Sequence, residues 1–395
     1  MIQPPAPTPS FRPLRTGALV VGLLGLTASL IGWFVLGDRA LESYFFAYLY
    51  FLDLTIGCLA LLALHYQVGG SWAAVTRRLL EAATRLFPLL AVLVVPVVFG
   101  AGVLFPWAHP AWVAADPILR HKQPYLNLPF FVGRVAVYFA SWWGLSHFLN
   151  RWSLEYDRHQ DFALLLKRRR LGAVTLLVLA ITVTLAWIDW VMSLEGHWYS
   201  TIFGMLVGVG QLYVGLAFIT ALFTTLAHDE PLRSLSGPRI FNDLGNLSLT
   251  FVLGWAYLAF VELLVVWTGN LPDETIWYFH RIRNGWKSVS MLLAGAHFAV
   301  PFLASLFKPI TRSRTRLRVL AAWMLGAHLI DVYWMVLPSF QARFSLAWTD
   351  LTAVLGIGGV WFATYLWQVS RYPVVPVLDP QRLRVLHAAL SETGR

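Results

Sequence analysis

Cysteine is almost absent from this chain of 395 residues, in which Cys58 is the only one. A single thiol excludes a disulfide within the chain, an iron-sulfur cluster held by several thiolates and a CxxCH haem attachment. Charged residues are also scarce, at 13% of the chain against 58% hydrophobic residues. A water-soluble globule of this size cannot bury so much apolar surface, so lipid must solvate much of the chain.

Acidic residues are fewer than basic ones, which gives a formal net charge of +10. The basic residues lie in short clusters between apolar runs rather than along one patch, so we expect no nucleic-acid partner and interpret them as topology signals. The chain also lacks a Gly-rich phosphate loop, an HExxH motif and a nucleophile elbow. These absences leave no sequence signal for a metal site or a hydrolytic centre.

Long apolar runs dominate what is present. A bilayer core of about 30 Å needs roughly 20 apolar residues in a helix. Ten segments approach or exceed that length: 16 to 36, 43 to 66, 86 to 106, 128 to 149, 171 to 191, 200 to 227, 244 to 268, 286 to 307, 318 to 338 and 346 to 369. We therefore expect an all-α integral membrane protein, with one membrane domain over residues 16–370 and terminal tails at 1–15 and 371–395.

The distribution of Lys and Arg predicts the orientation of these spans. Alternate connections carry 22 of the 30 basic residues on the side that holds both termini and 7 on the other side. By the positive-inside rule, both termini are expected in the cytoplasm. The clusters at 167–170 and 312–318 are the strongest anchors.

Several ionisable groups fall inside the predicted spans. Such groups are costly in hydrocarbon, about 2.5–3.5 kcal/mol each on insertion scales, so they usually face a bundle interior and mark a site or a pathway. The candidates for a proton path or a quinone site are Asp53, His65, Arg134, His147, Asp189, Glu262, His297, His328, Asp331 and Asp350.

Some of these candidates have a structural alternative. His328 and Asp331 share a helix face, where they can exchange a proton or merely tie two helices together. A salt bridge with Asp189 or Asp350 is the simplest account of Arg134. Asp189 and Asp350 lie near helix ends, where capping is an alternative role, and Glu262 can reach the outer interface. No pair of histidines has the spacing of stacked haem ligands.

Two loop motifs carry a more specific signal. The first is DWVMSLEGHWYSTIFG at 189–204, and the second is WTGNLPDETIWYFHR at 267–281, closed by Asn284-Gly-Trp286 and preceded by Leu244-Gly-Asn and Trp255-Ala-Tyr-Leu-Ala-Phe260. With these motifs the chain resembles the F subunit of bacterial alternative complex III, a respiratory quinol-oxidising complex. That subunit is similar to the membrane anchor of polysulfide reductase, in the NrfD-like family.

The resemblance implies a fold and a set of partners. The fold would be two four-helix bundles, at 43–191 and 200–338, with peripheral first and last helices. The partners would be a homologous C subunit, a periplasmic iron-sulfur protein, a multihaem cytochrome c, small membrane subunits, lipids and a terminal oxidase, in the bacterial inner membrane. Haem and iron-sulfur clusters would lie in those partners, and quinone or menaquinone would be the ligand. Glu262 departs from the family pattern, which has an uncharged polar residue there.

Three functions remain open at this point. The chain can support quinol oxidation and proton movement, with the redox centres in partner subunits. It can be a non-catalytic scaffold of the same complex, in which case buried carboxylates would tolerate conversion to amides. It can also be a stand-alone proton-coupled transporter, although Pro88 and Pro96 have no clear counterpart in the second half beyond Pro301.

Overall fold

The computed structural model describes residues 11–159 and 161–375. Every regular element in these ranges is a helix, which confirms the expected all-α class. The expected tails at 1–15 and 371–395 fall largely on residues 1–10 and 376–395, which lie outside the described residues.

Nine helical segments of the described chain are long and apolar enough to cross a membrane. They are Arg12–Leu36 (α1), Asp38–Val68 (α2), Ser71–Phe99 (α3 to α5), Phe162–Leu194 (α10 and η2), Phe203–Leu226 (α11), Pro238–Gly269 (α13), Trp286–Leu306 (α15, η3 and α16), Arg314–Ser339 (α18 and η4) and Trp348–Ser370 (α19). The protein is thus a multi-pass membrane protein. The one remaining expected span, 128–149, coincides with α9 (Leu128–His159), a long helix whose Trp, Tyr and Ser side chains make it less apolar.

Shorter elements join or interrupt these helices. In the third span, α3 (Ser71–Thr84), α4 (Phe87–Leu93), α5 (Val95–Phe99) and α6 (Ala101–Leu104) follow one another, with prolines at the starts of α4 and α5. The end of the helices opposite α12 is named the outer end, after the orientation expected from the charge distribution. At this end lie η1 (Pro106–Ala108), α7 (Pro110–Ala115), α8 (Pro117–Lys122), η2 (Met192–Leu194), α14 (Pro272–Ile282) and η4 (Leu337–Ser339). At the opposite, inner end lie α12 (Leu232–Leu235) and α17 (Lys308–Thr311).

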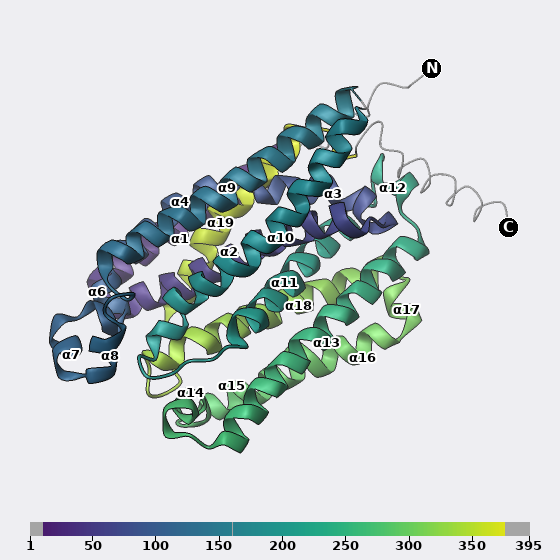
Figure 1. Cartoon of the computed structure of the whole chain (residues 1–395). Coiled ribbons are helices and arrows are strands. Elements are labelled where there is room, and N and C mark those ends of the chain that lie inside the picture. Colours follow the sequence, from purple (N-terminus) through teal and green to yellow (C-terminus); the bar gives the residue numbers. More distant parts are fainter. Residues whose placement is uncertain (1–10, 160, 376–395) are drawn as a thin grey trace.

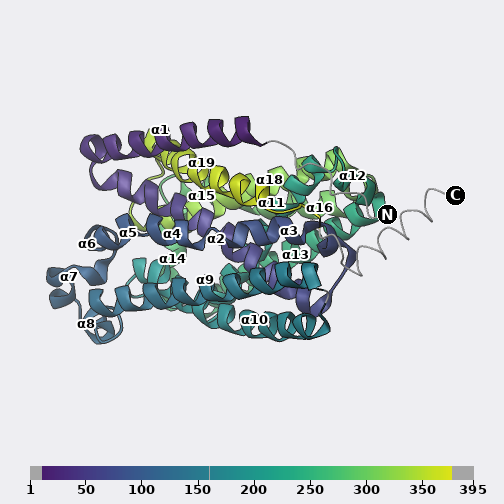
Figure 2. The same ribbon diagram turned by 90° about the horizontal axis from the view of Figure 1, so that it is seen from above.

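The long helices form two groups that meet at α2 and α11 (Figures 1 and 2). In the first group, α2, α3, α9 and α10 pack around one another, and in the second, α11, α13, α18 and the helical segment from α15 to α16 do so. The pair α1 and α19 lies outside, against α2. Helix α2 is central because it is apolar on all sides, and most of its residues are buried.

Small residues allow the closest helix crossings. Gly25 on α1 faces Gly356 on α19, where an added Cβ would lie 2.5 Å from the backbone of Gly356. Gly57 on α2 faces α11, where an added Cβ would lie 1.9 Å from the carbonyl oxygen of Gln211. In lipid, helices associate through such close backbone contact rather than through a hydrophobic driving force.

The third span begins earlier than expected. The sequence predicts a span at 86–106 after a basic connection, whereas the structure continues the helix back to Ser71. Helix α3 is amphipathic by sequence and contains Arg77, Arg78 and Glu81, yet nearly all of it is buried against α2, α9 and α19. The charges pair with one another inside the protein, which makes the polar segment compatible with burial.

Candidate functional site

The crossing of α2 and α11 creates the centre of the site. Because Gly57 and Gly215 let these helices touch, Asp53 comes within hydrogen-bond reach of α11. The Nε2 of Gln211 donates to Oδ1 of Asp53 at 2.8 Å, and Nε2 of His328 lies 3.3 Å from Oδ2. Asp53 is 1% exposed. Each oxygen of its carboxyl group therefore has a polar partner, as is usual for a buried polar group.

A π-helical turn presents the second histidine. Pro301 has no N–H, so the carbonyl of His297 loses its usual helical donor four residues on. The chain forms the π turn Ala294–Ala299 (η3) at this point, and the Tyr213 hydroxyl donates to the His297 carbonyl at 3.4 Å. The His297 ring stacks on the Tyr213 ring, with centroids 4.2 Å apart. Such turns inside helices occur frequently at functional sites.

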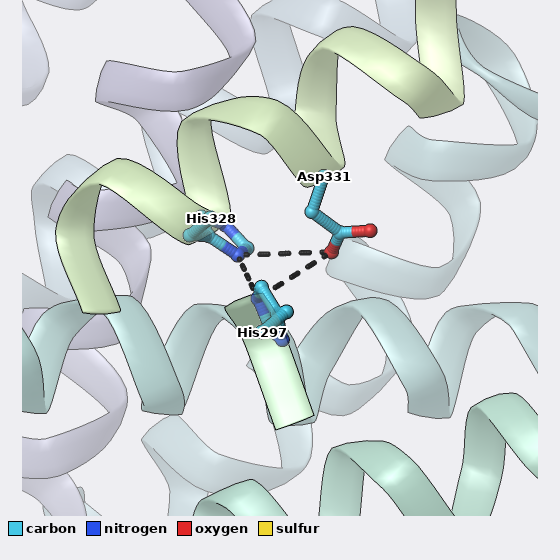
Figure 3. A group of neighbouring side chains, drawn as sticks. All are labelled: His297, His328 and Asp331. Carbon is cyan, nitrogen blue, oxygen red and sulfur yellow. Dashed lines mark hydrogen bonds and ion pairs between the residues drawn. The ribbon is translucent and has the colours of Figure 1, made fainter. Parts of the chain in front are cut away.

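His297, His328 and Asp331 converge on one point between η3 and α18 (Figure 3). The Nε2 of His297 lies 3.3 Å from Nδ1 of His328, and each of these nitrogens lies 3.8 Å from Oδ2 of Asp331. The structure thus places His328 and Asp331 on one helix face, as their spacing indicates, and adds Asp53 and His297 from other helices. The contacts of 3.3 Å join Asp53, His328 and His297 in one series, and chains of carboxylates and imidazoles of this kind can pass a proton.

The same three groups have the separations that a metal ion needs. A tetrahedral zinc site with bonds of 2.0–2.2 Å has ligand atoms about 3.4 Å apart. The observed distances of 3.3 and 3.8 Å are close to that value. Asp53, on the far nitrogen of His328, is placed as the carboxylate that often orients a histidine ligand. No sequence motif indicates this arrangement, because the three residues come from two separate helices.

A large cavity leads to this cluster. It measures about 610 Å³, lies between α11, α13, α14, the helix containing η3 and α18, and includes Asp53, His328 and Asp331 in its lining. Most of its wall is aromatic or aliphatic, including Trp255, Leu293, Phe298 and Trp334. Tyr257 and Phe260 line it while remaining more than half exposed, so the cavity opens to the protein surface beside α13. A mainly apolar cavity with a few converging polar groups is typical of a small-molecule site.

The two loop motifs meet at the outer end of this cavity. Trp198 of the first motif stacks on Trp277 of the second, with centroids 4.0 Å apart, and both rings line the cavity. Glu195 and His280 form a polar contact of 2.8 Å between the same motifs. Glu262, also in the cavity wall, accepts a hydrogen bond from Ser200 at 2.7 Å. The motifs therefore form one structural unit above the cavity.

Outside the spans, a further polar contact ties the outer segments together. Nε2 of His197 lies 2.6 Å from Oδ2 of Asp116, at the start of α8. Asp116 also caps α8 by accepting from the backbone N–H of Ile118 and Leu119. The hydrogen bond with His197, together with these backbone bonds, lowers the pKa of the Asp116 carboxyl.

Four expected site residues take part in separate structural contacts. Arg134 forms a two-pronged ion pair with Asp189, at 2.8 and 2.9 Å, and Tyr138 donates to the same carboxylate. Asp350 accepts from the backbone N–H of Ala347 at the start of α19 and pairs with Arg39 at 2.7 Å. The first pair joins α9 to α10, and Asp350 caps α19 and joins it to α2. These contacts agree with the salt-bridge and capping roles that the sequence left open for these residues. His147 is exposed on α9 and does not line the cavity. Its ring lies near that of Trp143, with centroids 6.0 Å apart.

His65 belongs to a different polar region, at the inner end of the first bundle. There, Glu81 of α3 lies between Arg77, Arg78 and Arg85, at 3.6, 2.5 and 3.8 Å. Asp157 of α9 pairs with Arg77 and Arg78. Sequence reasoning missed this inner ion cluster, because it assigned the arginines to a solvated connection. The amphipathic period of residues 71–84 was the available signal.

A scan against models of protein families finds none that matches the chain, and a search of curated proteins finds no match either.

Proposed function

We propose that this chain is a membrane subunit of a respiratory quinol-oxidising complex, in which the apolar cavity binds a quinol head group against Asp53, His328 and Asp331. The observation that carries the proposal is the position of these three groups in the lining of a cavity open beside α13. A lipid-soluble ligand with a polar head and an apolar tail fits both parts of such a cavity.

The chemistry of the cluster supports this assignment. Oxidation of a quinol to a quinone releases two electrons and two protons. A general base within hydrogen-bond reach of the hydroxyl must accept each proton. His328 and Asp331 face the cavity and His297 lies behind them, so a proton taken from the ligand has neighbouring acceptors. The electrons would pass to a haem or iron-sulfur centre in a partner subunit, consistent with the lack of thiolate ligands in this sequence.

The wider assignment follows from the resemblance and the charge distribution. We place the complex in the bacterial cytoplasmic membrane, with the inner end and both termini of this chain in the cytoplasm. The cavity then lies toward the periplasmic side, where an iron-sulfur or cytochrome partner would receive the electrons. Glu262, at the outer part of the cavity, is positioned for proton release on that side.

Substitution of Asp331 tests the proposal. In the purified complex, Asp331→Asn removes a base without changing the size of the side chain, and we expect quinol oxidation to fall roughly 10²- to 10⁴-fold. The exposed residue Asp38 provides a matched control, Asp38→Asn, with the same chemical change at the start of α2. Wild-type turnover in Asp331→Asn and Asp53→Asn would overturn the proposal and favour a scaffold role. Purification of an active transporter without partner chains would also contradict it.

A further inference from the structure

A second, smaller cavity lies at the inner end of the first bundle and is independent of the proposed quinol site. It measures about 300 Å³ and lies between the end of α2, the start of α10 and α9. Its lining includes Tyr66, Arg77, Tyr156, Arg168 and Arg169. Three of these residues are arginines, and none of the described residues that line the cavity is an aspartate or a glutamate. The cavity therefore has a positive wall.

Arg168 is the most unusual residue of this wall. It is 1% exposed, and its Nε and Nη1 atoms have no hydrogen-bond partner among the described residues. Its guanidinium lies over the Tyr156 ring at 4.2 Å and the Tyr66 ring at 5.3 Å. Those rings attract the cation but accept none of its N–H groups in the plane of the guanidinium. Within the part of the chain that the structure describes, the buried Tyr66 hydroxyl also makes no hydrogen bond.

The nearby carboxylates are engaged elsewhere. Glu81 contacts Arg77, Arg78 and Arg85, and Asp157 contacts Arg77 and Arg78. No salt bridge joins Arg168 to a carboxylate of the described chain. A buried charge without a counter-ion costs several kcal/mol, so native proteins rarely leave one uncompensated. These pairs leave the buried charge of Arg168 without a counter-ion among the described residues.

We propose that this cavity binds a phosphate group through Arg168 and the Tyr66 hydroxyl. Guanidinium N–H groups form a fork that matches two phosphate oxygens. The position of the cavity favours the head group of an anionic phospholipid, because Val68 and Leu165 in its lining are exposed apolar residues that acyl chains can contact. The proposed orientation puts both residues on the cytoplasmic side of the membrane. Basic pockets between helices on that side of a membrane are a recurring way of binding acidic lipids.

Lipid binding to the purified protein tests this assignment. Native mass spectrometry would compare dioleoyl phosphatidylglycerol, dioleoyl phosphatidylcholine and inorganic phosphate as ligands. Loss of a charge-assisted hydrogen bond is expected to weaken phosphatidylglycerol binding about 10- to 100-fold in Arg168→Gln. The control Arg170→Gln removes the same charge from an exposed position on the same helix and should leave binding near the wild-type value.

A stability measurement separates a ligand role from a structural one. If the arginine serves a bound phosphate, phosphatidylglycerol should raise the melting temperature of the wild type but not of Arg168→Gln. In lipid-free detergent, the variant should be at least as stable as the wild type, because it no longer buries an unpaired charge. If Arg168→Gln does not fold, Tyr66→Phe should still weaken binding roughly threefold to tenfold through loss of one hydroxyl.

The three ligands distinguish the sources of the phosphate. Binding of phosphatidylglycerol but not phosphatidylcholine or inorganic phosphate would identify a lipid head group. Stabilisation by inorganic phosphate alone, lost in Arg168→Gln, would identify a site for the free anion. Equal responses of the wild type and Arg168→Gln to all three ligands would overturn the proposal, and they would leave the quinol assignment untouched.

Discussion

Two buried polar clusters of this protein use intramembrane charge in different ways. Direct ion pairs close the inner ion cluster, which consists of Arg77, Arg78, Glu81, Arg85 and Asp157. In the cluster of Asp53, His297, His328 and Asp331, the shortest contacts are 3.3 Å, longer than the 2.5 Å between Arg78 and Glu81, and this cluster faces a cavity. The first arrangement suits a fixed structural role. The second arrangement leaves room for a ligand and for movement of a proton. The adjoining cavity is therefore the feature that separates a candidate site from a structural cluster.

The largest effect on stability is expected in the inner ion cluster. Glu81→Gln removes the carboxylate that three arginines share, and leaving their charges buried should lower the free energy of unfolding by about 3–5 kcal/mol. Unfolding of the purified protein in detergent measures this change. The matched control is Glu155→Gln on α9, an exposed position where the change should stay within about 0.5 kcal/mol. If the two substitutions lower the free energy of unfolding equally, the inner ion cluster does not have the structural role assigned to it.

A substitution at the central helix crossing should affect both fold and ligand binding. Gly57→Ala places a Cβ against the Gln211 carbonyl, so α2 and α11 must separate. Overpacking of this kind typically costs about 1–3 kcal/mol, and it would also pull Asp53 away from Gln211. We expect weaker quinol binding together with a lower melting temperature. Gly133→Ala on α9 is the control, because an added Cβ there meets no atom within 4 Å.

Filling the cavity should affect binding while leaving stability nearly unchanged. Ala256 lies on α13 in the cavity wall, and Ala256→Phe would occupy space that the ligand needs. Titration with a quinol analogue should show a higher dissociation constant, by about tenfold or more. Val265→Phe on the same helix adds a ring at an exposed position outside the cavity wall. If both variants bind the analogue as the wild type does, the ligand lies elsewhere.

The smallest effect is expected at the outer contact between Asp116 and His197. Since the pKa of Asp116 is lowered in the folded protein, its contribution is present above the ordinary value of 3.8 and disappears as the pH falls through the lowered value. Both side chains are partly exposed, so the contribution should be below about 1 kcal/mol. Melting temperatures measured at decreasing pH should fall slightly less in Asp116→Asn than in the wild type. A larger loss would mean that this contact stabilises the fold as strongly as a buried ion pair.

Hydropathy predicted the helices well, because the length of an apolar run is a local property. The span expected at 286–307 is observed as Trp286–Leu306, and that expected at 200–227 as Phe203–Leu226. The spacing of His328 and Asp331 also predicted a shared helix face, since three residues nearly complete one turn. The predicted start of the third span was wrong. The arginines of residues 71–84 are neutralised by partners that are distant in sequence, such as Asp157, and hydropathy does not include such pairs.

The composition of the candidate site could be predicted only in part. The sequence identified Asp53, His297, His328 and Asp331 as buried ionisable residues, but it could not show that three helices bring them together. That proximity depends on the Gly57 crossing and on the π turn before Pro301. Gln211 and Tyr213 were not singled out at all, because neither is charged and each gains its role from a partner on another helix.

Photolabelling with an azido-quinone tests the central claim most directly. Bound in the cavity of the purified complex, the analogue should cross-link to peptides of α13 and α18 near Trp255, Tyr257 and Trp334. Excess unlabelled quinol should compete, and Asp331→Asn should reduce the labelling. Labelling confined to the lipid-facing surfaces of α1 and α19, without competition, would contradict the account.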